Sequence, residues 1–462
     1  MLSRETRQIV STTEAHQHTR RAMLAGLAAG ATAMLAAACQ AGGARQGEQP
    51  GSPDTRRAVT IGWGIRTGAR PEDIDALITE WQQQYPNWKI ERTELSGGIA
   101  PAMEKLTAAL VSGVNIDVIS GFLSAYQMNE ALNALAPIEE YVRRDKYDTK
   151  RFNQDHLEFV GKYQGKLTAL PFAYGGDGPA MLLNRGMFQA AGVAIPSPDW
   201  RNSWSWDDFR AALKRLTREE GGQLVQVGLA SYGYIVNTPP LQWNAQWMTD
   251  DFKKIVCDSP EMIDCYTKYY DLLLRDRTMA GSPGANLGSG DPFVNGKAAV
   301  TVRCCAIPPY TEQLTSIDWV FVPFPRGKTA SPDIQAVIVG IGSQAKNPAE
   351  GWKFVQFLLE KSRLAEAEKR QPAIMDDVEP YARRHWGNLP ESRWQVFVEG
   401  TRIAKRVDPI RYHPMWQPMA NDVITPTMNA VNRGEKGVVE ALREMRPALQ
   451  RIVDEYESKK RA

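Results

Sequence analysis

The sequence predicts an α/β protein built from two lobes that meet at a hinged cleft. Its 462 residues are more than one hydrophobic core usually organises. Between residues 58 and 122, strand-like apolar runs alternate with stretches of helical periodicity, an order typical of a parallel sheet covered by helices. Farther along, two short apolar runs at 166–170 and 180–183 flank a loop with three glycines, as expected where a chain crosses from one lobe to another.

The first lobe begins with alternating strands and helices. Strands are predicted at 58–63, 88–93 and 117–119, with helices at 71–85 and 99–110 between them. Parallel strands of such a sheet present their carboxyl ends at one edge, where ligands bind. Trp63 and Phe122 lie at two of these ends and are therefore candidate ligand-binding residues.

The stretch after Gly161 carries the predicted crossing between the lobes. Pro171 is expected to close the strand at 166–170, because proline cannot donate to a sheet ladder. Tyr174 and Asp177 fall in the glycine loop that follows and are candidate ligand residues at the junction. Ser205, with Asp208 three residues later, predicts a capped helix start.

The rest of the chain continues the α/β pattern and ends in helices. Trp243 and Trp247 stand four residues apart in a predicted helix at 241–248, so they share one face and are candidate ligand residues. Arg303, at the end of a predicted strand, is another candidate. Further along, a strand followed by a loop is predicted at 223–234, and strands are predicted at 298–302, 319–322 and 334–341. Helices are predicted at 259–275, from Pro348 with Asn347 as its cap, and at 439–456.

The N-terminal segment has the features of an export signal. Arg20 and Arg21 precede a Gly/Ala-rich apolar stretch at 22–38, which is only weakly hydrophobic and resembles a twin-arginine signal. The stretch ends in Leu-Ala-Ala-Ala-Cys, which resembles a lipobox, so Cys39 is the predicted lipidation site. Residues 40–57 lack apolar bulk and are predicted to form a flexible tether.

Three motifs occur together in the order of one known family. Gly165–Gly192 reads GKLTALPFAYGGDGPAMLLNRGMFQAAG, Phe293–Val300 reads FVNGKAAV, and Asp318–Pro325 reads DWVFVPFP. In this order they resemble the family 1 extracellular solute-binding proteins, the carbohydrate-type receptors of ABC importers to which maltose-binding protein belongs. The likeness runs from about Val59 to the C-terminus.

The resemblance implies the two-lobed type II fold of periplasmic binding proteins. It places lobe 1 at 58–170 plus 334–380 and lobe 2 at 171–333 plus 381–462, with crossings near Pro171, at 323–333 and at 371–384. Trp416 resembles the family's C-terminal sugar-stacking aromatic. Where maltose-binding protein has a stacking tryptophan after the strand that here ends at Arg303, this chain has Cys304, Cys305 and Ala306, which argues against maltodextrin as the ligand.

The implied function is capture of a mono- or oligosaccharide or a polyol and its delivery to ABC permease subunits. The protein is expected to be a monomer anchored by lipid to the outer face of the cytoplasmic membrane. No enzymatic activity, cofactor or metal is expected. Two alternatives stay open: a secreted glycan-active hydrolase, and a surface lipoprotein without a transport role.

Charge and motifs limit the other possibilities. The formal net charge of +2 gives no reason to expect a nucleic-acid partner. The sequence lacks P-loop, G-x-S-x-G and H-E-x-x-H motifs, and its few histidines have no metal-ligand spacing to a cysteine. Cys257 and Cys265 could form a disulfide in an exported protein, whereas the adjacent Cys304 and Cys305 could be either bridged or free.

Overall fold

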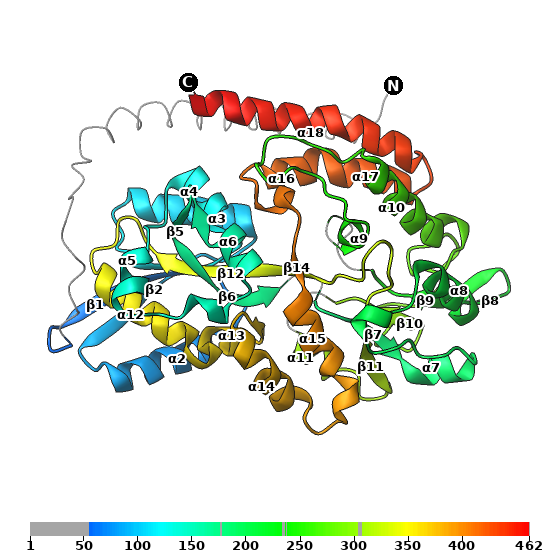
Figure 1. Ribbon diagram of the computed structural model, residues 1–462, viewed down its shortest axis with the longest axis horizontal. Helices are drawn as coiled ribbons and strands as arrows, with labels where there is room; N and C mark the ends of the chain where they lie inside the picture. The colour runs from blue at the N-terminus through cyan, green and yellow to red at the C-terminus, as the bar shows by residue number, and fades with distance from the viewer. Residues whose placement is uncertain (1–54, 176–177, 233–235, 237, 304–306, 462) are drawn as a thin grey trace, which may run out of the picture. The chain divides into compact units, whose positions relative to one another are not determined.

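A computed structural model describes residues 55–175, 178–232, 236, 238–303 and 307–461 (Figure 1). The predicted export signal with Cys39, nearly all of the predicted tether, Asp177 and the Cys304–Cys305 pair lie outside these residues. Among the helices that are described, none combines the length and the apolar character that a bilayer crossing needs.

One lobe is organised by a mixed sheet whose strands run in the order β13-β6-β12-β3-β1-β2, with β14 beside β12. β1 pairs in parallel with β2 and β3, whereas β12 runs antiparallel to β3 and β6. We call this sheet and its helices the seven-stranded lobe. Its strands are β1 (Val59–Ile65), β2 (Trp88–Glu94), β3 (Val118–Phe122), β6 (Ala169–Gly175), β12 (Asp333–Ile341), β13 (Gln371–Pro372) and β14 (Lys405–Arg406).

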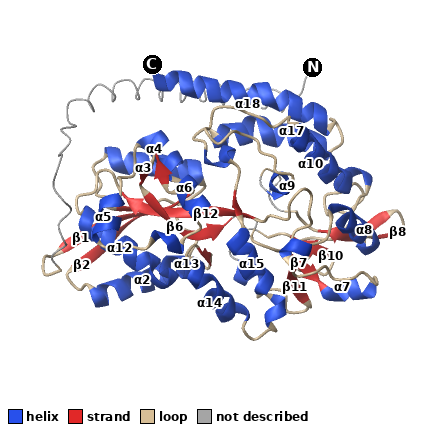
Figure 2. Cartoon of the chain, viewed as in Figure 1, coloured by secondary structure: helices blue, strands red, loops and turns tan. Residues whose placement is uncertain are grey.

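Helices cover both faces of this sheet (Figure 2). They are α2 (Pro71–Gln84), α3 (Ile99–Val111), α4 (Ala125–Leu132), α5 (Glu139–Arg144), α6 (Gln154–Val160), α12 (Pro348–Leu359) and α13 (Arg363–Ala367). A small hairpin of β4 (Lys162–Tyr163) and β5 (Lys166–Leu167) precedes β6. An aromatic cluster joins β1, α2, β2 and α12, and in it the Trp63 and Phe354 rings meet edge to face at 5.1 Å. Aromatic burial of this kind stabilises the lobe.

The other lobe has a five-stranded sheet in the order β11-β7-β10-β9-β8. We call it, with its helices, the five-stranded lobe. Its strands are β7 (Met181–Asn184), β8 (Arg218–Glu220), β9 (Gln223–Leu229), β10 (Ala298–Thr301) and β11 (Trp319–Val322). Around this sheet lie α7 (Arg185–Ala190), α8 (Trp206–Leu216), α9 (Thr238–Gln242), α10 (Pro260–Tyr270), α11 (Ile307–Thr311) and α15 (Gln395–Ile403).

The helical C-terminal part completes the five-stranded lobe. It contains α16 (Trp416–Pro418), the π-helical segment η7 (Met419–Ile424), α17 (Thr425–Asn432) and α18 (Val438–Arg461). α18 packs beside α17 and α10 (Figure 1). At its far end Lys460 pairs with Glu130 of α4, so this helix also touches the seven-stranded lobe.

The chain crosses between the lobes several times. It leaves the seven-stranded sheet after β6, returns from β11 to β12, crosses again along α14 (Met375–Trp386), and comes back to the seven-stranded sheet at β14 before it continues into α16. α14 is bound to the first lobe through the Ser362–Asp377 hydrogen bond, and Trp386 donates to Thr311 in the second. The lobes also touch through Tyr126 and Phe252, whose rings stack at 3.8 Å.

Most predicted elements occur where the sequence places them, but three details differ. β6 runs through Pro171 to Gly175, because a bulge opposite Val337 and Ile338 accommodates the residue that lacks an N–H. The predicted helix at 241–248 is absent: α9 ends at Gln242, and Asn244 has a φ of 53°, which helical backbone does not adopt. Asn347 does not cap α12, since its side-chain amide donates instead to Thr60 and Asp117.

The two described cysteines do not form the disulfide that their spacing allowed. Cys257 and Cys265 are free thiols buried in the five-stranded lobe. The Cys257 thiol lies 3.5 Å from the carbonyl oxygen of Leu442 in α18, so it contributes to packing between two helical segments. In contrast, the predicted capping box at Ser205 and Asp208 is present at the start of α8.

Candidate ligand-binding site

A cavity of about 540 Å³ lies between the lobes and has walls from both. We call it the interlobe cavity. The wall from the seven-stranded lobe is built at strand ends and along β12, and it includes Arg66, Ile99, Leu123, Gly175, Gln335, Val337 and Arg370. Strand ends supply several of these residues because parallel strands leave their carboxyl ends open at one edge of the sheet.

The opposite wall comes mainly from the helical part of the five-stranded lobe. It includes Arg411, Trp416, Gln417, Asn421, Thr425, Asn429 and Asn432. Apart from Arg411, these side chains recur along α16, η7 and α17, so one continuous helical surface presents them to the cavity. The apolar part of this wall consists of Val236, Ala420, Ile424 and Met428.

Arg66 is fixed at the edge of the cavity by main-chain carbonyl groups. Its guanidinium donates to the carbonyl oxygen of Gly121 at 2.8 Å and to that of Gly97 at 3.2 Å. Its own main-chain N–H donates to the carbonyl oxygen of Ser120 at 3.1 Å, which holds the end of β1 against β3. Gly121 has a φ of 96°, and a Cβ there would lie 1.8 Å from the Arg66 carbonyl oxygen. Only glycine permits this approach.

Arg370 and Gln335 occupy the same wall as Arg66. Arg370 pairs with the buried carboxylate of Glu368 at 2.7 Å, and burial raises the pKa of Glu368. The main chain of Gln335 pairs with Gly175 across the sheet, while its side chain reaches the cavity. Gln335 is 9% exposed, and its amide nitrogen makes no hydrogen bond within the described part of the chain. A buried donor in this state is costly unless a partner such as a ligand satisfies it.

Arg411 and Trp416 form a pair on the opposite wall. The Arg411 guanidinium carbon lies 4.4 Å from the centre of the Trp416 ring, a cation–π arrangement. Asp408 fixes the short helix Pro409–Tyr412 that carries Arg411, since its carboxylate accepts the N–H groups of Ile410 at 3.0 Å and Trp247 at 2.6 Å. Burial raises the pKa of Asp408 to about 7.

The predicted candidates in the first lobe are mostly core residues. Trp63 is fully buried, and its indole N–H donates to the Ser120 hydroxyl at 2.9 Å, so the ring packs inside the lobe. Phe122 is also fully buried, and its neighbour Leu123 lines the cavity in its place. Tyr174 packs edge to face against His156 at 5.1 Å, and burial raises its pKa.

The predicted candidates in the second lobe are also away from the interlobe cavity, apart from Trp416. Trp243 donates to Asp264 at 2.8 Å and Trp247 to Tyr266 at 3.1 Å, both from buried positions. They do not share a helical face, because the helix that would have aligned them ends before them. Arg303 pairs with Asp291 at 3.1 Å and lies over the Tyr310 ring. Asp177 lies outside the described residues.

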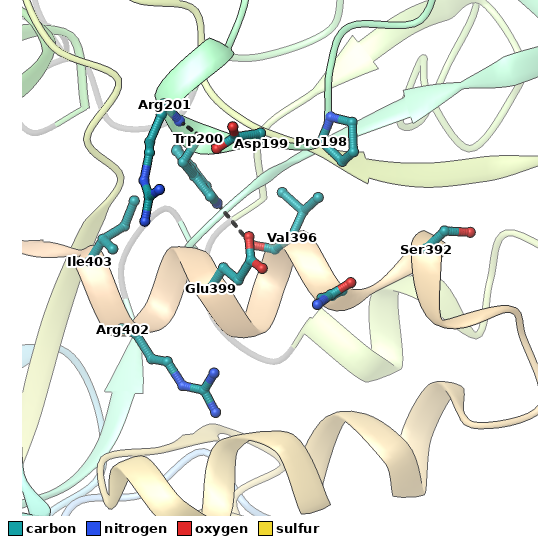
Figure 3. A pocket seen from close by; sticks show the side chains of 10 residues that line it. Pro198, Asp199, Trp200, Arg201, Ser392, Val396, Glu399, Arg402 and Ile403 are labelled. Atoms are coloured by element: carbon teal, nitrogen blue, oxygen red, sulfur yellow. Dashed lines mark hydrogen bonds between the residues drawn. The ribbon is translucent and has the colours of Figure 1, made fainter.

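A second cavity, of about 670 Å³, belongs to the five-stranded lobe alone. It lies between the turn at Pro198–Arg201 and α15, and Trp200 spans its floor by donating to the Val396 carbonyl oxygen at 3.2 Å (Figure 3). This second cavity is larger than the interlobe cavity, but a ligand bound in it would contact the five-stranded lobe only. It could not bias the arrangement of two lobes, so the interlobe cavity is the better candidate for a ligand that closes a cleft.

Metal binding has no support within the described ranges. No group of three or more His, Cys, Asp or Glu side chains there is arranged to hold an ion. The lining side chains of the interlobe cavity offer hydrogen-bond donors from guanidinium groups, donors and acceptors from amide and hydroxyl groups, and ring contact from Trp416.

Sequence reasoning missed most of this cavity. Arg66 follows β1 by one residue, so the strand-end rule pointed to the correct edge but to Trp63 instead. Arg370, Arg411 and Gln335 carry no local pattern, because only the folded chain brings them together. The amide-bearing face of α17 is visible as Asn429 and Asn432, three residues apart, a spacing that places both on one helical face.

The family model described as bacterial extracellular solute-binding protein matches residues 67–362. The fold matches solved structures of similar size. The sugar-binding protein MalE from Xanthomonas citri superimposes with a TM-score of 0.68 at 15% identity, covering 87% of this chain and 98% of that one. An ABC substrate-binding protein from Listeria monocytogenes in complex with cycloalternan gives 0.67 at 18% identity, covering 86% and 99%.

A solute-binding protein of an ABC transporter from Thermotoga lettingae, bound with α-D-tagatose, is also similar. Its TM-score is 0.64 at 19% identity, with 85% of this chain and 99% of that chain covered. At these identities the structural likeness establishes the two-lobed α/β fold, and the family match rests on the sequence itself.

Proposed function

Because the chain belongs to the family of bacterial extracellular solute-binding proteins, we propose that it captures a carbohydrate in the interlobe cavity and delivers it to the permease of an ABC importer. The observation that carries this proposal is a cavity lined by both lobes, with Trp416 beside rows of amide and guanidinium donors. Sugars offer CH faces that stack on aromatic rings and hydroxyl groups that accept and donate hydrogen bonds.

The arrangement supports a clamp mechanism. A solute in the cavity contacts Arg66, Gln335 and Arg370 from one lobe and Arg411 and Trp416 from the other. Such a ligand favours the conformation in which both walls reach it, and the connections between the lobes allow that movement. The closed form is the one expected to dock on the permease. The protein itself leaves the solute chemically unchanged.

Export and anchoring belong to the same proposal. The twin-arginine-like segment and Cys39 would direct the chain across the cytoplasmic membrane and attach it to the outer face through lipid. Metabolic labelling with a radioactive fatty acid tests this directly: the parent chain is expected to be labelled, and Cys39→Ala is expected to lose the label. Label retained by the variant would contradict anchoring at Cys39.

Calorimetric titration against a panel of sugars, polyols, amino acids and peptides tests the ligand class, and X-ray scattering with and without ligand tests closure. Binding of a sugar with a decrease in the radius of gyration is expected. Trp416→Ala should weaken binding about tenfold, since an aromatic or cation–π contact contributes about 1–2 kcal/mol. Trp204→Ala serves as a control, because Trp204 is another half-buried tryptophan that does not line the cavity.

Two outcomes would refute the proposal. Binding of an amino acid or peptide in preference to every sugar would assign a different solute class. Recovery of a chemically altered sugar after incubation, detected by mass spectrometry, would indicate an enzyme.

A further inference from the structure

The helical wall of the interlobe cavity carries two parallel rows of side chains. Helical backbone runs without a break from Trp416 to Asn432 through α16, η7 and α17. At every fourth residue an apolar side chain lines the cavity, and we call these the apolar row: Trp416, Ala420, Ile424 and Met428. One residue later in each turn a polar side chain lines it, and we call these, with one more at the end, the polar row: Gln417, Asn421, Thr425, Asn429 and Asn432.

The π-helical segment η7 keeps both rows on the side of the helix that faces the cavity. In an α-helix a step of four residues turns about 40° past a full turn, so a row at this spacing drifts around the axis. The wider turn of η7, Met419–Ile424, opposes that drift because its hydrogen bonds span five residues. The rows therefore stay in the cavity wall from Trp416 to the end of α17.

The polar row differs from an ordinary solvent-facing helix surface because it carries no charge. All five of its members are neutral, and Asp422 is the one charged residue between Trp416 and Asn432. Charged side chains recur throughout α18, which follows in the chain. Amide and hydroxyl groups both donate and accept hydrogen bonds, as the hydroxyl groups of a sugar do. Gln417 and Asn421 already show this complementarity, since the Gln417 amide donates to the Asn421 carbonyl oxygen at 3.0 Å.

The apolar row has a counterpart across the cavity. Ile99, Leu123 and Val337 line the wall of the seven-stranded lobe. A ligand between the walls is therefore offered apolar surface on both sides and hydrogen-bonding groups along one edge. A chain of sugar rings has this form, because CH groups cover the ring faces and hydroxyl groups project from the edges.

The length of the rows sets the length of the ligand. From Gln417 to Asn432 the helix rises about 20 Å. One turn rises about 5 Å, close to the length that one pyranose ring adds to an extended glycan. A single ring at Trp416 would leave Asn429 and Asn432 without a ligand contact, whereas a chain of several rings would reach them.

From these observations we infer that the ligand is a linear oligosaccharide of at least three sugar units, bound in an extended, ribbon-like form along the helix from Trp416 to Asn432. This inference rests on the proposed function and specifies its substrate class. One terminal ring stacks on Trp416, and the following rings place their hydroxyl groups along the polar row as far as Asn432. Because the rows are straight, they suit a β-1,4-linked chain better than an α-1,4-linked chain, which curves.

Calorimetric titration of the full chain with sugars of increasing length tests the inference. The β-1,4-linked series of glucose, mannose, xylose and galactose are each measured from the monosaccharide to the tetrasaccharide. In at least one series the trisaccharide is expected to bind at least about tenfold more tightly than the monosaccharide, because each added ring forms further hydrogen bonds. Maltotriose, with its curved α-1,4-linked chain, is expected to bind more weakly than that trisaccharide.

Variants place the chain along the rows. The double variant Asn429→Ala/Asn432→Ala removes the end of the polar row far from Trp416, and alanine favours the helix. It should weaken binding of the tetrasaccharide about tenfold, through lost hydrogen bonds, and leave the disaccharide unchanged. Trp416→Ala should weaken binding of both lengths. Gln83→Ala removes an exposed amide of α2, outside the cavity, and should have no effect on either. Circular dichroism confirms that each variant is folded.

The results separate this inference from the proposed function. A monosaccharide that binds as tightly as the longer sugars in every series overturns the extended oligosaccharide while carbohydrate capture stands. The same conclusion follows if maltotriose binds more tightly than every β-1,4-linked trisaccharide, or if the double variant affects the disaccharide and the tetrasaccharide equally. If no sugar of any length binds, both the inference and the proposed function fail.

Discussion

Replacing Gly121 by alanine should disrupt the strand end that presents Arg66. Gly121 combines a φ of 96° with close packing, since an added Cβ would lie 1.8 Å from the Arg66 carbonyl oxygen and 2.7 Å from its carbonyl carbon. Both are backbone atoms, so no side-chain rotation relieves the overlap. The end of β1 would have to move away from β3, and the guanidinium of Arg66 would move with it.

The expected loss of stability in Gly121→Ala has two parts, and the same substitution at a second glycine separates them. Holding an alanine at positive φ lowers the free energy of unfolding by about 1 kcal/mol. The enforced backbone shift adds about 1–3 kcal/mol, as overpacking does in other cores. Gly113, at the end of α3, has a φ of 76° and no heavy atom within 4 Å of the added Cβ. Gly113→Ala should therefore cost only the first part, and Gly121→Ala about 2–4 kcal/mol in all.

Urea unfolding followed by circular dichroism measures both variants against the parent. If the two lobes unfold in separate transitions, the comparison uses the transition of the seven-stranded lobe, because a single free energy would then be undefined. Equal losses in the two variants would refute the packing argument. A Gly121→Ala variant that is destabilised yet binds ligand like the parent would refute the link between this contact and Arg66.

Two further predictions concern a buried histidine and a buried carboxylate. Burial lowers the pKa of His156 from 6.5 to about 4, so its contribution to the free energy of unfolding is complete above pH 6.5 and is lost, by up to about 3 kcal/mol, as the pH falls toward 4. In His156→Phe, the difference between the free energies of unfolding at pH 7 and at pH 4.5 should be smaller than in the parent. A difference equal to that of the parent would contradict this prediction. Lys460→Met should lower the free energy of unfolding by about 1–2 kcal/mol, because it leaves the buried Glu130 carboxylate without its cation. Lys459→Met, at the exposed neighbouring position, should leave stability unchanged. Thermal unfolding compares the two variants, and equal shifts in the melting temperature would exclude a role for the Lys460–Glu130 pair.

Much of the fold was accessible from the sequence because its signals are local. The capping residues Ser205 and Asp208 are both near in sequence and in contact, so the start of α8 was predictable. The helix expected at 241–248 failed for a non-local reason: Trp243 and Trp247 are drawn into separate buried hydrogen bonds with α10, and Asn244 turns the chain between them. The four-residue spacing of the two tryptophans is compatible with a helix, but tertiary contacts favour a different local structure.

The candidate site was harder to predict because aromatic residues serve two purposes. Trp63 and Trp243 have the composition expected of sugar-binding residues, but their burial makes them core residues, and nothing local distinguishes the two roles. Trp416 is half-buried on the cavity wall, where a short helix presents it. The arginines were overlooked because 55 basic residues are spread along a chain with nearly balanced charge. Their convergence on one cavity exists only in three dimensions.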